Sequence, residues 1–312
     1  NSNVPTGWSQ ENFIQLEGGG DRIGDTVSDN LIIEGYELFE DPELYTVNMF
    51  IDSNKSETVK EKLVELCESR KDSIAITDVK YAHVVNNKGN ESTDITEWRK
   101  GITSPNFNVN SSYVALYGNW LNVYDKYNNK YRWIPASGFI AGIYAFNDNE
   151  RDPWWAPAGL NRGILDGVRK LAWNPKKTYR DDLYMSGVNP IVSFAGKGKV
   201  VWGQKTMLDE FSAFNRVNVR RLFLVIEKAI KDSAQYFVFQ PNDRDTRRRL
   251  VNMIDPYLAD VQSRRGVYDY LVKCDESNNT PERIDRNELW CDIYIKPTKA
   301  AEFIVLNFIA TR

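Results

Sequence analysis

The sequence is poor in the residues on which many enzyme and metal sites depend, and it has no long apolar run. Its 312 residues include one histidine and three cysteines, and Cys67, Cys274 and Cys291 are widely spaced without a CxxC pair. This pattern argues against a disulfide framework or a zinc site and is typical of a reducing compartment. No segment reaches the roughly 18 apolar residues of a membrane helix, and no signal peptide is visible. We therefore predict no membrane insertion.

A surplus of basic charge is also absent, because the formal net charge is −3. The chain lacks the overall positive field that favours nucleic-acid binding. The charge is unevenly spread, however. Residues 1–72 hold 16 acidic and 6 basic residues, net −10, whereas residues 212–249 hold 9 basic and 4 acidic residues, net +5. This distribution of charge is consistent with two kinds of partner. The acidic end of one copy can attract the basic segment of another copy, or the basic segment can bind nucleic acid.

What the chain does contain is an ordinary globular composition, with 42% hydrophobic, 27% charged and 12% aromatic residues. This length and composition allow two domains, each with its own core. Residues 1–35 are polar and include three consecutive glycines, so we expect an extended segment that completes a domain largely absent from this chain. The first residue is Asn rather than Met, and we expect a processed product or the ordered part of a longer protein.

Residues 44–79 have the pattern of a β-α-β unit. The stretch LYTVNMFID predicts a strand, residues 56–72 predict an amphipathic helix, and SIAITDV predicts a second strand. Thr58 and Glu61 have the spacing of a capping box at the start of this helix. A unit of this kind predicts parallel strands with a right-handed crossover.

The next segments lead to a predicted domain boundary. Residues 80–110 are polar and predict a long surface loop, and residues 111–138 predict aromatic-rich strands joined by a turn at Asn128 and Asn129. Prolines and glycines gather in DPWWAPAGLNRG. We therefore place a boundary near residue 160, between a middle or outer α/β domain at 36–160 and a C-terminal domain at 161–312.

The second half alternates strand and helix patterns. We predict two strands around a glycine turn at 189–207 and helices at 212–234 and 245–266, the second kinked or broken at Pro256. Further strands are predicted at 236–243, 267–275, 288–297 and 301–312. The whole pattern predicts an α+β fold with several domains. Its mixed β-sheets are flanked by helices, and its C-terminal strand is available for sheet pairing between subunits.

Two adjacent arginines, Arg220 and Arg221, interrupt the apolar pattern of the helix at 212–234. One interpretation is that their stems pack among apolar residues while the guanidiniums reach carboxylates or carbonyls. The alternative is a nucleic-acid-binding protein that holds phosphates with the basic segment at 216–249. The arginines that would serve it are Arg216, Arg220, Arg221, Arg244, Arg247, Arg248 and Arg249.

Signals for catalysis, cofactors and metals are weak. His83 has no nucleophile motif beside it. Asn147–Asp152 lacks the ligand spacing of a calcium loop, and Gly196–Lys199 lacks both the phosphate-loop pattern and a following helix. Trp154 and Trp155 suggest a glycosidase with stacked sugars and a pair of acids, but adjacent residues of a strand point to opposite faces. We therefore predict no catalytic residue, no cofactor and no metal.

The C-terminal stretch FIVLNFIA, residues 303–310, is nearly all apolar on both faces. A strand of this kind has to be buried on both sides. Burial in the chain's own sheet and pairing with the sheet edge of another molecule both satisfy this requirement.

Several segments, in this order, resemble the C-terminal half of contractile tail sheath proteins of T4-like bacteriophages. They are IPASGFIAGIYAFND (134–148), WWAPAGLNRGI (154–164), SGVNPIVSFAGKGKVVWGQKTM (186–207), RVNVRRLFLVIEKAI (216–230), FVFQPND (237–243) and FIVLNFIATR (303–312). The resemblance is specific over 130–312, loose over 36–130 and absent from 1–35. Lys205 and Thr206 stand where the family is expected to have Arg-Thr.

The resemblance implies a structural subunit and not an enzyme. Such a subunit polymerises as stacked rings around a tail tube and contracts to drive the tube through the host envelope, with its C-terminal domain as the inner layer. The implied partners are other sheath subunits, the tail tube protein, and baseplate and tail terminator proteins. The implied location is the virion tail, after assembly in the host cytoplasm. The interface candidates on this analogy are Arg216, Arg220, Arg221, Lys228, Lys231 and a linking strand of Phe303, Ile304, Val305, Leu306, Asn307, Phe308 and Ile309.

Overall fold

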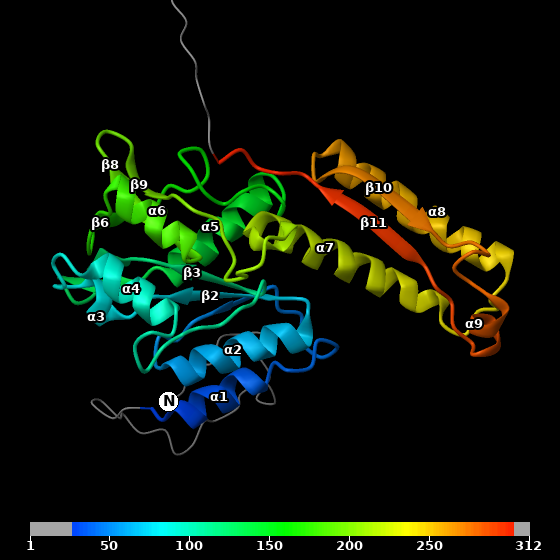
Figure 1. The fold of residues 1–312 in the computed structure, drawn as a ribbon, viewed down its shortest axis with the longest axis horizontal. Helices are drawn as coiled ribbons and strands as arrows, with labels where there is room; N and C mark the ends of the chain where they lie inside the picture. The colour runs from blue at the N-terminus through cyan, green and yellow to red at the C-terminus, as the bar shows by residue number, and fades with distance from the viewer. Residues whose placement is uncertain (1–26, 303–312) are drawn as a thin grey trace, which may run out of the picture.

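The computed structural model describes residues 27–302. Figure 1 shows a body that contains small β-sheets, and an arm of long helices and a β-hairpin that extends from the body. Helices and sheets are mixed throughout both parts. The predicted α+β class is therefore confirmed.

A parallel sheet lies at the centre of the body. Its strands follow the order β1 (Met49–Ile51), β2 (Ile74–Asp78), β3 (Val114–Tyr117) and β7 (Val188–Asn189). Helix α2 (Glu57–Arg70) connects β1 to β2, so the predicted β-α-β unit with parallel strands is confirmed. The predicted capping box is wrong, because Ser56 caps the helix: its Oγ accepts a hydrogen bond from the backbone N–H of Val59 at 3.3 Å.

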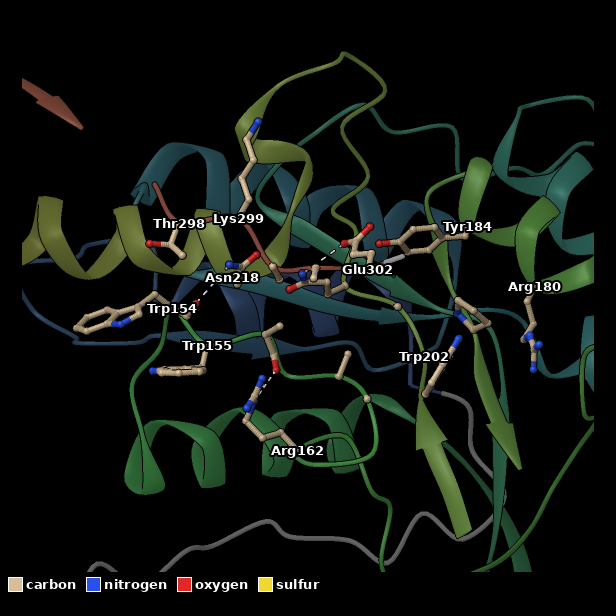
Figure 2. A pocket seen from close by; sticks show the side chains of 18 of the residues that line it. Trp154, Trp155, Arg162, Arg180, Tyr184, Trp202, Asn218, Thr298, Lys299 and Glu302 are labelled. Carbon is tan, nitrogen blue, oxygen red and sulfur yellow. Dashed lines mark hydrogen bonds between the residues drawn. The ribbon is translucent and has the colours of Figure 1, made fainter. Parts of the chain in front are cut away.

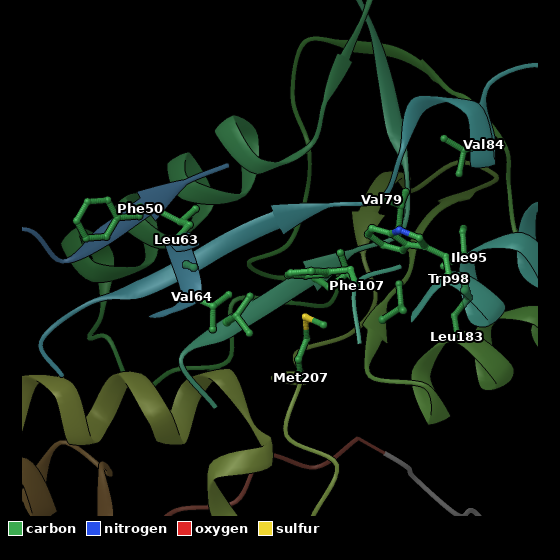
Figure 3. Packing of buried hydrophobic residues seen from close by; sticks show 14 of the residues in the cluster. Phe50, Leu63, Val64, Val79, Val84, Ile95, Trp98, Phe107, Leu183 and Met207 are labelled. Carbon is green, nitrogen blue, oxygen red and sulfur yellow. The ribbon is translucent and has the colours of Figure 1, made fainter. Parts of the chain in front are cut away.

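The segment predicted as a surface loop, residues 80–110, contains helices α3 (Tyr81–Val84) and α4 (Glu91–Arg99), and that prediction is wrong. Trp98 is 1% exposed and stacks on Phe107 with ring centroids 5.6 Å apart. Its indole N–H donates to Glu57 Oε1 at 2.8 Å. Figure 3 shows both rings within the same buried cluster as Met207. A few apolar residues are sufficient to bury α4 in this polar stretch, because Ile95 and Trp98 fall on one face of the helix.

Two hairpins stand where the sequence predicts them. Strands β4 (Trp120–Asp125) and β5 (Lys130–Pro135) pair around the turn at Asn128 and Asn129, and β6 (Val168–Leu171) pairs with the other edge of β4. Asn129 has a φ of 49°, in the left-handed region that asparagine tolerates well. Strands β8 (Ile191–Phe194) and β9 (Gly198–Val201) form the second hairpin, with Gly196 and Gly198 at positive φ in the turn.

One hydrophobic core crosses residue 160. It includes Ile143 from α5 (Ser137–Glu150) together with Leu165, Ile191 and Val217. Helix α5 packs on β1 and β2, and α6 (Lys177–Met185) packs on α4 and β7. The parallel sheet also joins β3 to β7 across this point. The division into domains at 36–160 and 161–312 stays a prediction.

The described end of the segment at 1–35 is helical and not extended as predicted. Helix α1 (Asp29–Glu37) packs along α2. The Ser56 hydroxyl donates to Asp29 Oδ2 at 2.6 Å, and the Tyr36 hydroxyl donates to the carbonyl of Ile51 at 2.9 Å. These bonds attach α1 to the chain's own β-α-β unit. Residues 1–26 lie outside the described part of the chain.

Three buried charged groups meet where β1 and β2 end. Asp52, Lys60 and Asp78 are 5%, 1% and 0% exposed, and the Lys60 ammonium binds the Asp52 carboxylate. Asp78 Oδ1 accepts hydrogen bonds from the backbone N–H groups of Ala136 at 2.9 Å and Ser137 at 3.0 Å, and so caps α5 from a strand. Burial, followed by the Asp52 charge, raises the pKa of Asp78 to about 7.

The arm begins after a short 3-10 turn, η2 (Ala213–Asn215). It consists of α7 (Val217–Ala234), η3 (Gln235–Phe237), α8 (Arg244–Ser263), β10 (Val267–Lys273), α9 (Pro281–Asp285) and β11 (Asp292–Pro297). The two predicted helices and the two predicted strands of this region are confirmed. Helix α8 continues through Pro256, so the proline does not break it. The strand predicted at 236–243 is wrong, since η3 and a turn occupy this stretch and no described strand lies beside it.

Candidate assembly interface

Helix α7 connects the body to the arm (Figure 1). Val217 and Leu224 belong to the body core, whereas Leu222 and Ile226 belong to the core of the arm, with α8. The helix therefore has apolar contacts on two sides along its first three turns. This double burial fixes the direction in which the arm leaves the body.

Arg220 lies inside the chain, 7% exposed. Its guanidinium donates to Ser112 Oγ at 2.5 Å and is held between the rings of Tyr113 and Phe214, whose centroids are 4.2 and 4.1 Å from Cζ. No carboxylate pairs with it among the described residues. Burial lowers the pKa of this guanidinium. The two aromatic faces stabilise the buried cation by cation–π attraction.

Arg221 points to the other side of α7 and is 5% exposed. Its guanidinium donates to Asp148 Oδ2 of α5 at 2.5 Å and lies over the ring of Tyr144 at 4.5 Å. Tyr144 shares a 2.7 Å hydrogen bond with the hydroxyl of Tyr117, and burial raises the pKa of Tyr144 to about 12. Both arginines thus bind α7 to the body, and a contact of either side chain with a second subunit stays a prediction.

Arg216 precedes α7 and binds the C-terminal segment. Its Nε and one terminal nitrogen donate to the two oxygens of Glu302, at 2.6 and 2.9 Å. Such a two-bond pair fixes direction as well as distance. Glu302 is the last described residue, so the pair fixes the point from which the predicted linking strand continues. The strand itself, Phe303–Ile309, lies outside the described residues.

Glu302 also lines a cleft of about 620 Å³ between the body and the base of the arm. Figure 2 shows Glu302 beside Tyr184, with Trp154 and Trp155 farther along the cleft and Trp202 on the side of β9. Burial and the Glu302 carboxylate raise the pKa of Tyr184. The segment 298–302 runs along this cleft from β11 back to the body.

The Arg216–Glu302 pair can be tested by a double-mutant cycle. The side chains are 33% and 17% exposed, so water weakens the attraction. We expect a coupling of about 1 kcal/mol between Arg216→Ala and Glu302→Ala in the free energy of unfolding. Urea titrations of the unsubstituted chain, the two single variants and the double variant measure this coupling energy, which should fall in high salt. Additive effects of the two substitutions would contradict the pairing.

The basic segment does not form one surface. Arg220, Arg221 and Arg247 are buried, and the Arg247 guanidinium donates to Asn242 Oδ1 at 2.9 Å. Arg216 is occupied by Glu302. The exposed arginines of this segment are Arg244, Arg248 and Arg249. Binding of nucleic acid would require most of these arginines on one exposed face of the protein. Their distribution between buried and exposed positions argues against this alternative.

The two lysine candidates lie on the outer part of α7. Lys228 has its Nζ 4.0 Å from Asp72 Oδ2, at the end of α2. Lys231 is exposed. Lys231 can therefore reach a neighbouring surface, whereas the Lys228 ammonium is buried against the body. The place of either lysine in a subunit interface stays a prediction.

The hairpin of β10 and β11 offers two free edges, because it is a sheet of two strands within residues 27–302. One face packs on α8 through Tyr270, Val272 and Ile295. The opposite face exposes the cross-strand pair Leu271 and Tyr294, at 59% and 56%. Sheets of two strands are marginally stable alone, and unpaired edges are templates for a further strand.

The residues considered above for catalysis and metal binding pack or pair with other parts of the chain. His83 lies against Trp98 with ring centroids 5.4 Å apart, and burial lowers its pKa. Asp152 forms an ion pair with Arg264 at 2.6 Å. Trp154 is 6% exposed and donates to the Arg264 carbonyl at 3.1 Å, so it cannot serve as an open sugar platform.

Across residues 27–302, His, Cys, Asp and Glu side chains form no group of three or more that could hold a metal ion. Within the same range, no helix combines the length and the apolar character that crossing a membrane requires.

The fold is similar to that of contractile sheath proteins. A sheath protein of an extracellular contractile injection system, the PVC sheath complex in its contracted state, aligns with a TM-score of 0.74 and 25% identity, over 88% of this chain and 74% of that one. The helical sheath of the anti-feeding prophage in its contracted state aligns with a TM-score of 0.72 and 24% identity, over 91% and 76%.

Sequence comparison gives the family. The models of the phage tail sheath protein central domain and the phage tail sheath C-terminal domain match residues 39–207 and 209–311. The tail sheath proteins of Vibrio phage KVP40 and Enterobacteria phage T4 are 39% and 35% identical to the chain, each over 99% of it and 48% of the relative. The chain belongs to the phage tail sheath protein family, and it spans about half the length of these relatives.

Proposed function

We propose that this chain is part of a structural subunit of a contractile phage tail sheath. The subunit polymerises as stacked rings around a tail tube and contracts to drive the tube through the host cell envelope. The single observation that carries this proposal is the similarity to tail sheath proteins over 99% of the chain. Its fold is also that of sheaths solved in the contracted state.

The structure supports a specific way of linking subunits. The apolar stretch Phe303–Ile309 directly follows Glu302, which Arg216 holds against the body. Within residues 27–302 the β10–β11 hairpin has free edges, and its outer face exposes the apolar pair Leu271 and Tyr294 between two charged pairs. The stretch from one subunit would add to an edge of this hairpin in another, so that main-chain hydrogen bonds join them. Two lysines of α7, the exposed Lys231 and the half-buried Lys228, would lie at the contact with a neighbouring subunit.

Such links allow a transition between two packings. Exposed ion pairs contribute about 0–1 kcal/mol each, so they can break and re-form while subunits rotate. Strand pairing between chains would persist and keep the polymer connected. Contraction then needs only that the final packing has more stabilising contacts than the first. The sequence has no phosphate-loop pattern for ATP, and the role we propose is not enzymatic.

The proposed partners are further copies of the subunit, the tail tube protein, and baseplate and tail terminator proteins. The proposed location is the tail sheath of the virion, after assembly in the host cytoplasm. Nucleic acid is not among these partners, because the basic segment has most of its arginines turned into the protein. A gel-shift assay should accordingly show no strongly salt-dependent binding of DNA.

The linking strand provides the decisive experiment. Ile304→Glu, Leu306→Glu and Phe308→Glu, introduced together in the full-length subunit, should abolish tubular polymers, because three carboxylates cannot be buried in a strand between sheets. Electron microscopy and sedimentation measure the polymers.

The matched control is Ile304→Val, Leu306→Ile and Phe308→Tyr, which keeps an apolar strand and should still assemble. Normal tubes from the glutamate variant would refute the linking strand. An unsubstituted full-length subunit that never forms tubes, at any concentration, would refute the proposed function itself.

A further inference from the structure

Two of the three cysteines face each other across the hairpin of the arm. The last register pair joins Lys273 to Asp292, and Cys274 and Cys291 are the next residues beyond it, where continuation of the register places them opposite each other. The two thiols lie close enough for each to shift the pKa of the other. Opposite residues of antiparallel strands have Cα atoms about 4.5–5.5 Å apart, which lies within the range of disulfide-bonded cysteines. Both cysteines are free thiols in this structure.

A pair of buried asparagines holds the backbone on both sides of the cysteines. Asn278 Nδ2 donates to the Lys273 carbonyl at 2.7 Å and to Asp292 Oδ2 at 3.0 Å. Asn279 Nδ2 donates to the Trp290 carbonyl at 2.9 Å, and its Oδ1 accepts from the Trp290 N–H at 2.8 Å. Asn278 and Asn279 are 5% and 2% exposed. Residues before Cys274 and on both sides of Cys291 are thus fixed in place.

The environment also favours ionisation of one sulfur. The hydrogen bond from Cys291, with the nearby Arg247 cation, lowers the pKa of the Cys274 thiol against the effect of burial. Cys291 is partly exposed, whereas Cys67 is fully buried in α2 and burial raises its pKa to about 12. The pair combines a thiol of lowered pKa with access from solvent, and Cys67 has neither property.

We propose that Cys274 and Cys291 form a reversible redox site that closes the far end of the arm with a disulfide when a small-molecule disulfide oxidant is present. One cysteine thiolate attacks a sulfur of the oxidant, breaks its S–S bond and releases one thiolate. The second cysteine loses its proton to solvent, attacks the first cysteine sulfur and releases the other thiolate. Two electrons pass from the cysteine pair to the oxidant, which leaves as two thiols. A reducing medium reverses the exchange. This inference does not depend on the proposed function.

The test uses oxidised glutathione as the probe. The 312-residue chain is incubated with it at pH 8, blocked with N-ethylmaleimide and digested with trypsin without reductant. Cleavage after Lys273, Arg283, Arg286 and Lys299 places the cysteines on separate peptides, 274–283 and 287–299. We expect these peptides joined by a disulfide in most molecules, and separated after dithiothreitol.

Two controls make the result specific. Cys274→Ser and Cys291→Ser should each yield at most a glutathione adduct on the remaining cysteine of the pair. The peptide with Cys67 should carry the maleimide only when the block is repeated in denaturant. Oxidation should also raise the midpoint of thermal unfolding of the unsubstituted chain by several degrees, and not that of either variant. A glutathione adduct without the joined peptides, or a disulfide to Cys67 or between chains, would overturn the assignment.

Discussion

Replacement of both Arg220 and Arg221 by alanine is expected to leave the chain insoluble or largely unfolded. Each guanidinium is buried and holds α7 to a different layer of the body, through Ser112 and two aromatic rings or through Asp148 and Tyr144. The loss of three desolvated cation–π contacts and a largely buried ion pair should cost about 4 kcal/mol or more. This is a large part of the roughly 5–15 kcal/mol by which a protein of ordinary stability is folded.

Two single substitutions serve as controls for the charge and the burial of these arginines. Arg221→Lys keeps a cation beside Asp148, but it loses the planar group over Tyr144, so we expect an intermediate loss of stability. Arg248→Ala removes an exposed arginine of the same basic segment and should change the free energy of unfolding by less than about 0.5 kcal/mol. Soluble expression, circular dichroism and urea titration measure these effects. A soluble, fully assembling double-alanine subunit would show that the pair is dispensable.

Asp78→Ala should destabilise the chain by about 3 kcal/mol, since it leaves the buried N–H groups of Ala136 and Ser137 without an acceptor. Asp78→Asn is the matched control, because its side-chain oxygen can accept the same two bonds. We expect it to stay within about 1 kcal/mol of the unsubstituted chain at pH 8. Equal losses from both substitutions would mean that Asp78 does not act as the cap of α5.

The same residue predicts a pH dependence. The pKa of Asp78 is raised from 3.8 to about 7 in the folded chain, so between these values the folded state binds more protons than the unfolded state. Its contribution to stability is fully present below pH 3.8 and is lost as the pH rises through about 7. The unsubstituted chain should therefore lose stability relative to Asp78→Asn between pH 5 and pH 8. Paired urea titrations at both values measure this difference, and an opposite or absent trend would contradict it.

Local patterns were sufficient for much of the fold. The alternation and helical periodicity of residues 44–79 predicted β1, α2 and β2 with parallel pairing, because each element has its own apolar face and polar ends. The turn at Asn128 and Asn129 predicted the β4–β5 hairpin for a similarly local reason. The tail sheath resemblance came from motifs in their order along the chain, and family comparison confirms it.

Where few or misleading apolar residues carried the signal, prediction failed. Helix α4 was missed because its stretch is polar, although Ile95 and Trp98 supply apolar side chains to its buried face. The residues Tyr236, Val238 and Phe239 have strand-forming side chains, but they are 84%, 58% and 100% exposed and have no strand beside them within the described residues. A strand depends on a partner, and a local pattern does not specify one.

The amino-acid sequence by itself determined the elements with strong periodicity, the absence of zinc-finger spacing, and the family. Only the tertiary structure decided what the charged residues do. Arg220 and Arg221 are adjacent in sequence, yet they bind α7 to different segments of the chain. Asp78 caps a helix that begins 59 residues later. Cys274 and Cys291 meet because the strand register places them opposite each other. The physical reason is that the energy of a charge or thiol depends on its burial and its partners, and distant segments supply both.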